Sequence, residues 1–236
     1  AAFNVKVEDT VGAGDVYNRG AQGNQYSTFF GENVGRNSTE AENSAFGYNV
    51  LQKNTTGYSN SAFGSSALYA NIAGAQNSAF GSNALISNIS GNLNSAFGLN
   101  ALYSNTEGSN NSAFGKGSLG SNTTGNQNTA LGNSAGDTII GGVPNTTPNN
   151  SVFIGFGTTA NANNETNQIV IGHSARGDGS NSVVLGNSSI TRTRLQGQVI
   201  MGSFTTQPSG IEGAIYYNST DKKHYGFNGT SWNALY

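Results

Sequence analysis

Short hydrophobic clusters recur along the chain at a constant spacing and are separated by polar residues and glycine. The spacing is 17 residues, without slippage, over six copies. A fixed period of this length is typical of a repeat protein, in which each unit buries its apolar face against its neighbours. The copies are Asn-Ser-Ala-Phe-Gly at 43–47, 60–64, 77–81, 94–98 and 111–115, and Asn-Thr-Ala-Leu-Gly at 128–132.

Each unit also contains a second hydrophobic position and a polar turn. A leucine follows the motif glycine by four residues, as in Leu68 and Leu85, and a turn such as Asn-Thr-Thr-Gly at 54–57 closes the unit. Ser-Ala-Phe is too short for a helix, and the later copies contain β-branched runs such as Ile-Val-Ile. Asn and Gly tolerate the left-handed backbone that tight corners need. We therefore predict an all-β protein with two short strands in each unit.

The repeat extends beyond the clear copies, so the expected shaft covers residues 24–190 in about ten coils. Ser27 to Gly31 precedes it, and three degenerate copies follow, at 150–155, 167–172 and 181–186. The segment 133–149 contains two prolines and is interpreted as an inserted loop.

Stacked coils place the same residue type above itself at about 4.8 Å. Two hydrophobic ladders are expected, and Asn at a fixed position can add an amide ladder. The first, expected to be a core ladder, is Phe30, Phe46, Phe63, Phe80, Phe97, Phe114, Leu131, Ile154, Ile171 and Leu185. The second is Leu51, Leu68, Leu85, Leu102 and Leu119.

The apolar content of one coil favours an assembly of several chains. Two large apolar residues per coil contribute roughly 3–6 kcal/mol when buried, whereas ordering 17 residues costs on the order of 20 kcal/mol. We therefore expect an intertwined homotrimer, in which three chains place their Phe and Leu ladders about a common axis. The alternative is a monomeric β-solenoid.

Composition narrows the classes of function. The 236 residues include 35 Asn, 34 Gly and 28 Ser, and only 9% are charged, with a net charge of −2. This argues against a polybasic nucleic-acid surface. The chain has no cysteine, so it has neither a disulfide framework nor a zinc knuckle. Its apolar runs are too short for membrane insertion.

The two ends differ from the repeat. Residues 1–23 contain an alternating Phe3-Val5-Val7 strand and are expected either to cap the shaft or to pair with another subunit. Residues 191–213 are expected to form a linker. Residues 214–236 predict a small antiparallel β-meander, with a hairpin signal at Asn228-Gly229. Its aromatic residues either form the meander's own core or line a surface that contacts a receptor, such as a sugar. The possible contact residues are Tyr216, Tyr225 and Trp232.

No cluster of titratable residues indicates catalysis, and no catalytic, metal-binding or cofactor-binding residue is assigned. His173 and His224 lie in different modules, and no phosphate loop is present. The Arg176-Gly177-Asp178 tripeptide is an integrin-type signal, but it also arises by chance in Gly-rich loops. A glycan depolymerase needs a pair of carboxylates, and the candidates are scattered: Asp137, Glu165, Asp178 and Glu212.

The run Asn-Ser-Val-Val-Leu-Gly-Asn-Ser-Ser at 181–189 resembles the head repeats of trimeric autotransporter adhesins. The 17-residue version is similar to repeats of predicted phage tail fibres. The resemblance implies a left-handed parallel β-roll, or β-helix, of three intertwined chains. The sequence has no heptad stalk and no membrane-barrel segment, and we therefore expect a phage fibre or a secreted filament subunit rather than a self-exporting adhesin.

The expected function is a non-enzymatic structural and adhesive fibre, most simply a phage tail fibre, or its distal part, that attaches to a host surface. The alternative is a bacterial extracellular filament or surface adhesin, and a fibre-borne glycan depolymerase comes third. The expected partners are sister chains and a host-surface glycan or protein receptor. An extracellular location follows from either of the first two functions, on a virion or on a bacterial surface.

Overall fold

A computed structural model describes residues 16–18, 27–35, 37–38, 42–196, 203–208 and 213–235. The expected all-β class is confirmed, because every regular element in these residues is a strand. The chain divides into two compact units, Ala1–Ile190 and Thr191–Tyr236. The expected Phe3-Val5-Val7 strand and most of the 191–213 linker lie outside the described residues.

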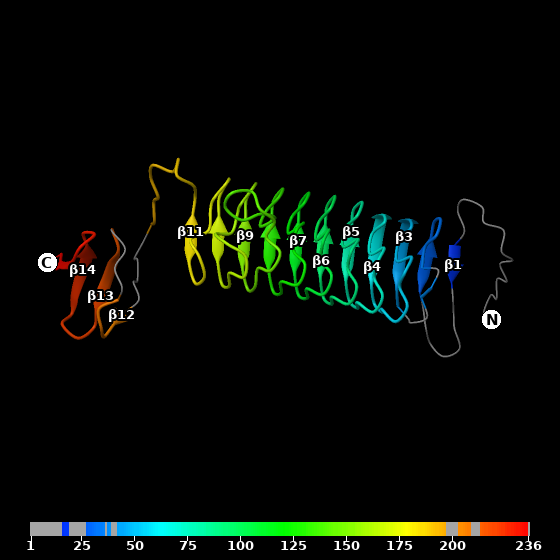
Figure 1. Cartoon of the computed structure of the whole chain (residues 1–236), viewed down its shortest axis with the longest axis horizontal. Helices are drawn as coiled ribbons and strands as arrows, with labels where there is room; N and C mark the ends of the chain where they lie inside the picture. Colours follow the sequence, from blue (N-terminus) through cyan, green and yellow to red (C-terminus); the bar gives the residue numbers. More distant parts are fainter. Residues whose placement is uncertain are drawn as a thin grey trace. The chain divides into compact units, whose positions relative to one another are not determined.

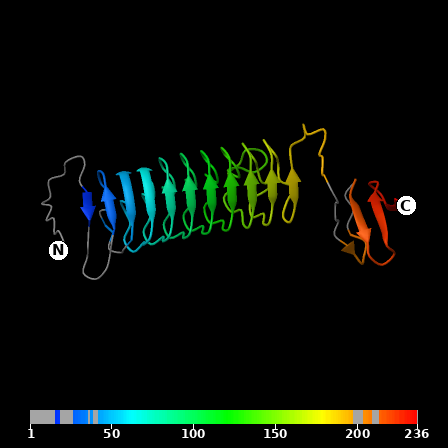
Figure 2. The ribbon, with the colours of Figure 1, turned by 180° about the vertical axis from the view of Figure 1, so that it is seen from behind.

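The first unit is a β-solenoid whose eleven strands form one sheet in chain order (Figure 1, Figure 2). Strands β2 to β11 are parallel, and β1 pairs antiparallel with β2. The strands are β1 Val16–Asn18, β2 Thr28–Phe30, β3 Ser44–Tyr48, β4 Ser61–Ser65, β5 Ser78–Phe80, β6 Ser95–Phe97, β7 Ser112–Phe114, β8 Thr129–Leu131, β9 Val152–Ile154, β10 Ile169–Ile171 and β11 Val183–Leu185.

The register between neighbouring strands follows the sequence period. Ser61, Ala62 and Phe63 of β4 pair with Ser78, Ala79 and Phe80 of β5, and the next two strands repeat the match. Each residue type therefore stacks on itself along the sheet, as the 17-residue spacing predicts.

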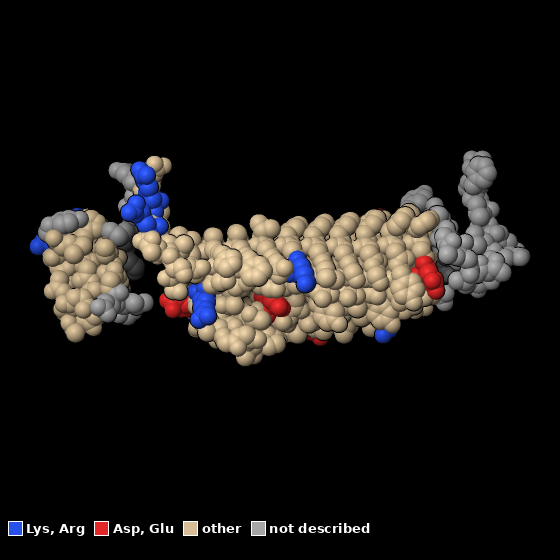
Figure 3. Space-filling view, turned by 90° about the horizontal axis from the view of Figure 1, so that it is seen from above, with Lys and Arg blue, Asp and Glu red and all other residues tan. Residues whose placement is uncertain are grey.

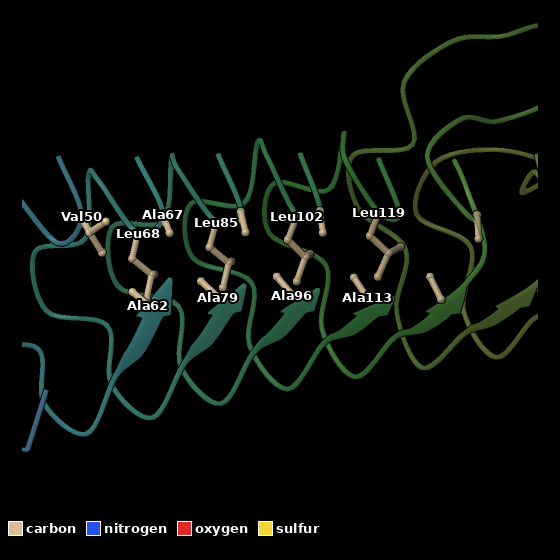
Figure 4. Packing of buried hydrophobic residues seen from close by; sticks show 14 of the residues in the cluster. Val50, Ala62, Ala67, Leu68, Ala79, Leu85, Ala96, Leu102, Ala113 and Leu119 are labelled. Carbon is tan, nitrogen blue, oxygen red and sulfur yellow. The ribbon is translucent and has the colours of Figure 1, made fainter. Parts of the chain in front are cut away.

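The interior of the solenoid is filled by alanine and leucine. The middle residue of each Ser-Ala-Phe strand points inward, so Ala62 and Ala79 are fully buried. Leu68, Leu85 and Leu102 come from the opposite side of the coil and are also fully buried. Figure 4 shows these leucines facing the strand alanines, coil after coil. A single chain thus encloses its own apolar interior.

The expectation that the second ladder lies at an axis shared by several chains is therefore wrong, because Leu51 to Leu119 are buried inside one chain. The first ladder lies outside this interior, because residues next to each other in a strand point to opposite faces. When Ala45 points inward, Phe46 points outward and is 45% exposed. That sister chains make this first ladder a shared core stays a prediction. Buried alanines, such as Ala62 and Ala79, and buried amides add to the apolar contribution of the large side chains.

Two rows of buried asparagine complete the interior and confirm the expected amide ladder. In one row, Nδ2 of Asn88 donates to Oδ1 of Asn71 at 2.8 Å and to the carbonyl oxygen of Gly91 at 3.0 Å. The same Gly91 oxygen accepts a hydrogen bond from Nδ2 of Asn77, in the second row, at 2.8 Å. Hydrogen bonds between coils thus replace part of the apolar burial that a small coil lacks. The rows are Asn54, Asn71, Asn88, Asn105, Asn122 and, separately, Asn43, Asn60, Asn77, Asn94, Asn111, Asn128.

The last residue of each Asn-x-x-Gly turn is a glycine, and the buried amides occupy the space that a side chain there would need. A Cβ on Gly57 would lie 2.3 Å from Oδ1 of Asn54 and 2.4 Å from the carbonyl oxygen of Gly74. No larger residue fits there without displacing the hydrogen-bonded amides. The Asn-x-x-Gly turn of the sequence is therefore one structural unit.

The buried leucines adopt a left-handed backbone conformation, with φ of 51° at Leu68 and 52° at Leu85. This conformation costs a residue other than glycine about 1–2 kcal/mol. Burying a leucine side chain contributes roughly 1.5–3 kcal/mol. Burying the leucine therefore gives little net free energy of stabilisation. The interior amides and alanines supply the remaining stabilisation of the coil.

The insertion in segment 133–149 is a small hairpin on an otherwise continuous coil. Thr138 and Pro144 form an antiparallel bridge, and Ile139 N donates to the Val143 carbonyl oxygen at 2.8 Å. At the tip, Ile140 is 40% exposed and Val143 51% exposed. The solenoid turn resumes at Asn145, which is fully buried.

The second unit contains a four-stranded sheet, made of β12 Ser203–Phe204, β13 Ile215–Asn218, β14 Lys223–Phe227 and β15 Trp232–Ala234. Strands β13, β14 and β15 pair antiparallel, which confirms the expected meander. β12 pairs parallel with β13. Asn228 lies in the β14–β15 turn, where its Oδ1 accepts hydrogen bonds from Thr230 N and Ser231 N.

Candidate interaction surface

The residues of the first ladder, Phe30 to Leu185, lie on the outer face of the solenoid sheet, and we call this row the outer aromatic ladder. It contains six phenylalanines followed by four aliphatic residues. Its phenylalanines stack in nearly parallel planes. The ring centroids of Phe63 and Phe80 are 4.8 Å apart, as are those of Phe80 and Phe97, with interplanar angles of 9° and 3°. This spacing equals the distance between strands. The backbone register therefore sets the geometry of the outer aromatic ladder.

The ladder is more exposed than a hydrophobic core allows. Phe97 is 37% exposed, Phe114 40% and Leu131 52%. Single exposed apolar residues are common on soluble proteins, but here the ladder residues follow one another along ten strands. Six of the ten are exposed, and the other four, Phe30, Phe80, Ile154 and Ile171, are half-buried. A continuous apolar patch larger than a few hundred Å² generally marks an interface.

The residues two positions before the ladder members add no charge to this surface. The residue two positions before each ladder member shares its face and is Ser61, Ser78 or Ser95 in the central strands. Further along the sheet it becomes Val152 and Ile169. The surface is therefore neutral and becomes more apolar toward β11, where Val183 and Leu185 are 62% and 54% exposed.

Charged side chains lie on other parts of the solenoid and are sparse. On the side shown in Figure 3, only a few lysine, arginine and acidic side chains are visible over the length of the solenoid. Lys53 lies over the ring of Tyr69 at 4.9 Å from the ring centroid. These scattered charges form no patch that would attract a polyanion.

The three residues proposed to contact a receptor come together in the C-terminal sheet. The rings of Tyr216 and Tyr225 stack at 5.3 Å, and Trp232 meets Tyr216 edge-on at 4.6 Å. Tyr216 is only 4% exposed, and Trp232 Nε1 donates to the Pro208 carbonyl oxygen at 3.1 Å. This arrangement favours the core interpretation of Tyr216 and Trp232 over the sugar-binding one.

Tyr225 has a polar role in addition. Its hydroxyl donates to a carboxylate oxygen of Asp221 at 2.5 Å. This hydrogen bond, with a smaller contribution from desolvation, raises the pKa of Tyr225 above its ordinary value. The proton thus stays on the tyrosine and links β14 to the preceding turn.

The remaining chemical candidates do not come together. His173 stacks on Phe156 with ring centroids 5.4 Å apart, whereas His224 lies on β14 of the other unit. Asp137 accepts a hydrogen bond from Ser121 Oγ at 2.8 Å, and Glu165 accepts one from Ser180 Oγ. These two carboxylates therefore link adjacent coils. Glu212 lies outside the described residues.

The Arg176-Gly177-Asp178 tripeptide lies on the surface of the last coils. Arg176 and Asp178 are exposed, and Gly177 is buried. Nothing else around the tripeptide indicates a receptor site.

Within the described ranges, no three His, Cys, Asp or Glu side chains form a group that could hold a metal ion. The described part of the chain also contains no helix of the length and apolarity needed to cross a membrane. Comparison of the chain with protein-family models, with curated proteins and with solved structures returns no match.

Proposed function

We propose that the chain is a non-enzymatic subunit of an extracellular fibre. In this proposal the solenoid is a rigid shaft, three chains associate along their outer aromatic ladders, and the fibre attaches to a host surface as a phage tail fibre does. The observation that carries the proposal is the continuous, uncharged and exposed ladder on an otherwise complete solenoid. The sister chains cover this ladder; they are not needed to complete the interior.

The exposed area is large enough to drive association. A phenylalanine side chain that is about 40% exposed leaves roughly 80 Å² of apolar surface in water, because a full ring buries about 200 Å². Covering that area contributes about 2 kcal/mol per rung at 25 cal/mol per Å². Ten rungs acting together exceed the 4–15 kcal/mol that association costs in translational and rotational freedom.

Attachment through a three-fold fibre depends on multivalency. Three identical weak contacts at one end of a rigid shaft bind with an avidity far above that of one contact. Nine steps between the ten parallel strands give a shaft of about 43 Å at 4.8 Å per step. The receptor in this proposal is a glycan or protein of the host surface.

A second candidate, an extracellular bacterial filament that grows end to end, is favoured by the open edge at β11. Among the strands that the structure describes, β11 pairs only with β10, so the backbone groups on its other side have no partner within the described sheet. Val184 is half-buried there, whereas Val170, at the same position of β10, is fully buried. Exposed strand edges of this kind pair readily with other chains.

Negative-stain electron microscopy of the purified chain, combined with its mass in solution, tests the proposal. Discrete short rods with the mass of three chains support the fibre shaft. Long filaments whose length grows with protein concentration support the end-to-end candidate instead. Release of reducing sugar from a bacterial surface polysaccharide would contradict the non-enzymatic assignment.

A further inference from the structure

The first asparagine row is a directional chain of amide hydrogen bonds. From Asn71 to Asn122, Nδ2 of each asparagine donates to Oδ1 of the asparagine one coil earlier, at 2.7–2.8 Å. The second hydrogen of Nδ2 goes to a glycine carbonyl oxygen of the same coil. At the N-terminal end, Asn54 Nδ2 donates to Ser38 Oγ at 3.0 Å. Within the row, every amide hydrogen and every oxygen up to Asn105 therefore has a partner.

The chain of amides breaks between Asn122 and Asn145. The two turns are direct neighbours, because Thr123 N donates to the Thr146 carbonyl oxygen at 2.8 Å and Thr123 Oγ1 donates to the same oxygen at 2.9 Å. Both asparagines are fully buried. Nevertheless, Asn122 Oδ1 and Asn145 Oδ1 are both buried without a hydrogen-bond partner. Two buried acceptors in neighbouring turns are thus left without the donor that the regular row supplies.

The hairpin insertion explains the break. In regular coils the asparagine backbone N–H donates to the carbonyl oxygen of the residue at the leucine position, as Asn122 N does to Leu119 at 3.0 Å. In the inserted coil the equivalent oxygen is the carbonyl oxygen of Gly136, and it accepts instead from Asn145 Nδ2 at 3.1 Å. The backbone N–H of Asn145 donates to the carbonyl oxygen of Asp137. The side-chain amide of Asn145 is therefore drawn away from Asn122.

We propose that one internal water molecule occupies this broken rung and donates its two hydrogens to Asn122 Oδ1 and Asn145 Oδ1. Two buried carbonyl-type oxygens need a donor with two hydrogens, and the described protein atoms supply none to them. Buried waters in proteins typically bridge such groups, and leaving either oxygen unpaired is costly. The two oxygens belong to neutral amides, and one water molecule supplies the two hydrogens that they need.

A high-resolution crystal structure of the whole protein, grown with rubidium chloride, tests the site. We expect density for one oxygen atom within hydrogen-bond distance of both Oδ1 atoms, without anomalous signal. An anomalous peak at this point would assign a monovalent cation and overturn the proposal. Absence of density would also overturn it, as would an Asn145 amide turned over so that Nδ2 donates directly to Asn122, because side-chain amide orientation is set by the hydrogen-bond network.

A deletion variant tests the cause of the break in the same crystals. Asn122 and Asn145 are 23 residues apart, six more than the 17 residues between the other asparagines of the row. Removal of the six residues Ile139–Pro144 restores the period. We expect a direct bond from Asn145 Nδ2 to Asn122 Oδ1 at the 2.7–2.8 Å of the other rungs, and loss of the water. Retention of the water in the variant would contradict the assignment; the result on the unaltered protein decides the proposal even if the variant does not fold.

Discussion

The ring of Phe153 occupies the space that a side chain on Gly136 would need: a Cβ built on Gly136 would lie 2.6 Å from Cδ2 of Phe153. Gly136 stands at the leucine position of its coil, and Phe153 stands at the inward alanine position of the next strand. A large residue and a small residue have thus exchanged sides of the interior. A related pairing of a large and a small residue occurs within the first coil, where a Cβ on Gly35 would lie 2.5 Å from the ring of Phe29.

This exchange predicts a strong coupling between the two positions. Phe153→Ala opens a cavity and should destabilise the protein by about 3–5 kcal/mol. Gly136→Leu overfills the interior and should cost about 1–3 kcal/mol or more. The double variant recreates the alanine–leucine pair of the regular coils and should be more stable than the Phe153→Ala variant. Thermal denaturation of the three variants measures the coupling, and strictly additive effects would contradict the exchange.

A second prediction concerns the interior amides. Asn88→Ala removes the donor to Asn71 and Gly91 and the acceptor of Asn105 Nδ2. Leaving buried polar groups without partners should cost on the order of 3 kcal/mol. Chemical denaturation measures this loss. Asn133→Ala is the control, since Asn133 is exposed on the surface, and its effect should remain within about 0.5 kcal/mol. Equal effects of the two substitutions would argue against a structural role of the amide row.

A third prediction separates core from contact residues in the C-terminal unit. Tyr216→Ala should disrupt the sheet, because Tyr216 is 4% exposed and touches Trp232; burial of an aromatic ring of this kind contributes about 3 kcal/mol or more. Trp232 is the only tryptophan, so its fluorescence reports on this unit alone. We expect a red shift for Tyr216→Ala and little change for Tyr217→Ala, whose side chain is only half-buried. An unchanged spectrum for Tyr216→Ala would reopen the receptor-contact interpretation.

A fourth prediction concerns pH. Because the hydrogen bond to Asp221 raises the pKa of Tyr225, the folded state favours the protonated phenol. This contribution is fully present below the ordinary tyrosine pKa of about 10 and is lost as the pH rises through the raised value. Asp221→Asn should therefore lower the pKa of Tyr225. NMR titration of the Tyr225 ring measures it, and an unchanged pKa in the variant would show that Asp221 is not the cause.

The period of the sequence was sufficient to predict the solenoid, its parallel register and the stacking of like residues. The period alone does not define which face is inside, and the large size of phenylalanine pointed to the wrong face. The later strands carried the missing signal: Phe153 and Val170 occupy the alanine position in runs of three apolar residues. The left-handed turn that buries Leu85 also lies beyond sequence patterns, because tertiary packing overrides the preference of leucine for other conformations.

In the C-terminal unit, too, the sequence predicts the local structure but not the pairing of separate segments. The Asn228-Gly229 turn and the three aromatic strands were predictable from local pattern. The parallel pairing of β12 with β13 was not, since it joins segments separated by a polar stretch with no pattern of its own. The hydrogen bond from Tyr225 to Asp221 likewise depends on how the β13–β14 turn folds back.

The central claim is that sister chains cover the outer aromatic ladder, and multi-angle light scattering tests it most directly. The unaltered chain should have three times the mass of 24.3 kDa. Phe97→Asp should yield monomers that keep their β-structure, because it places three charges against an apolar surface. Ile89→Asp, at a side chain of similar exposure away from the ladder, should remain trimeric. A monomeric unaltered chain, or a Phe97→Asp variant that still forms trimers, would contradict the account.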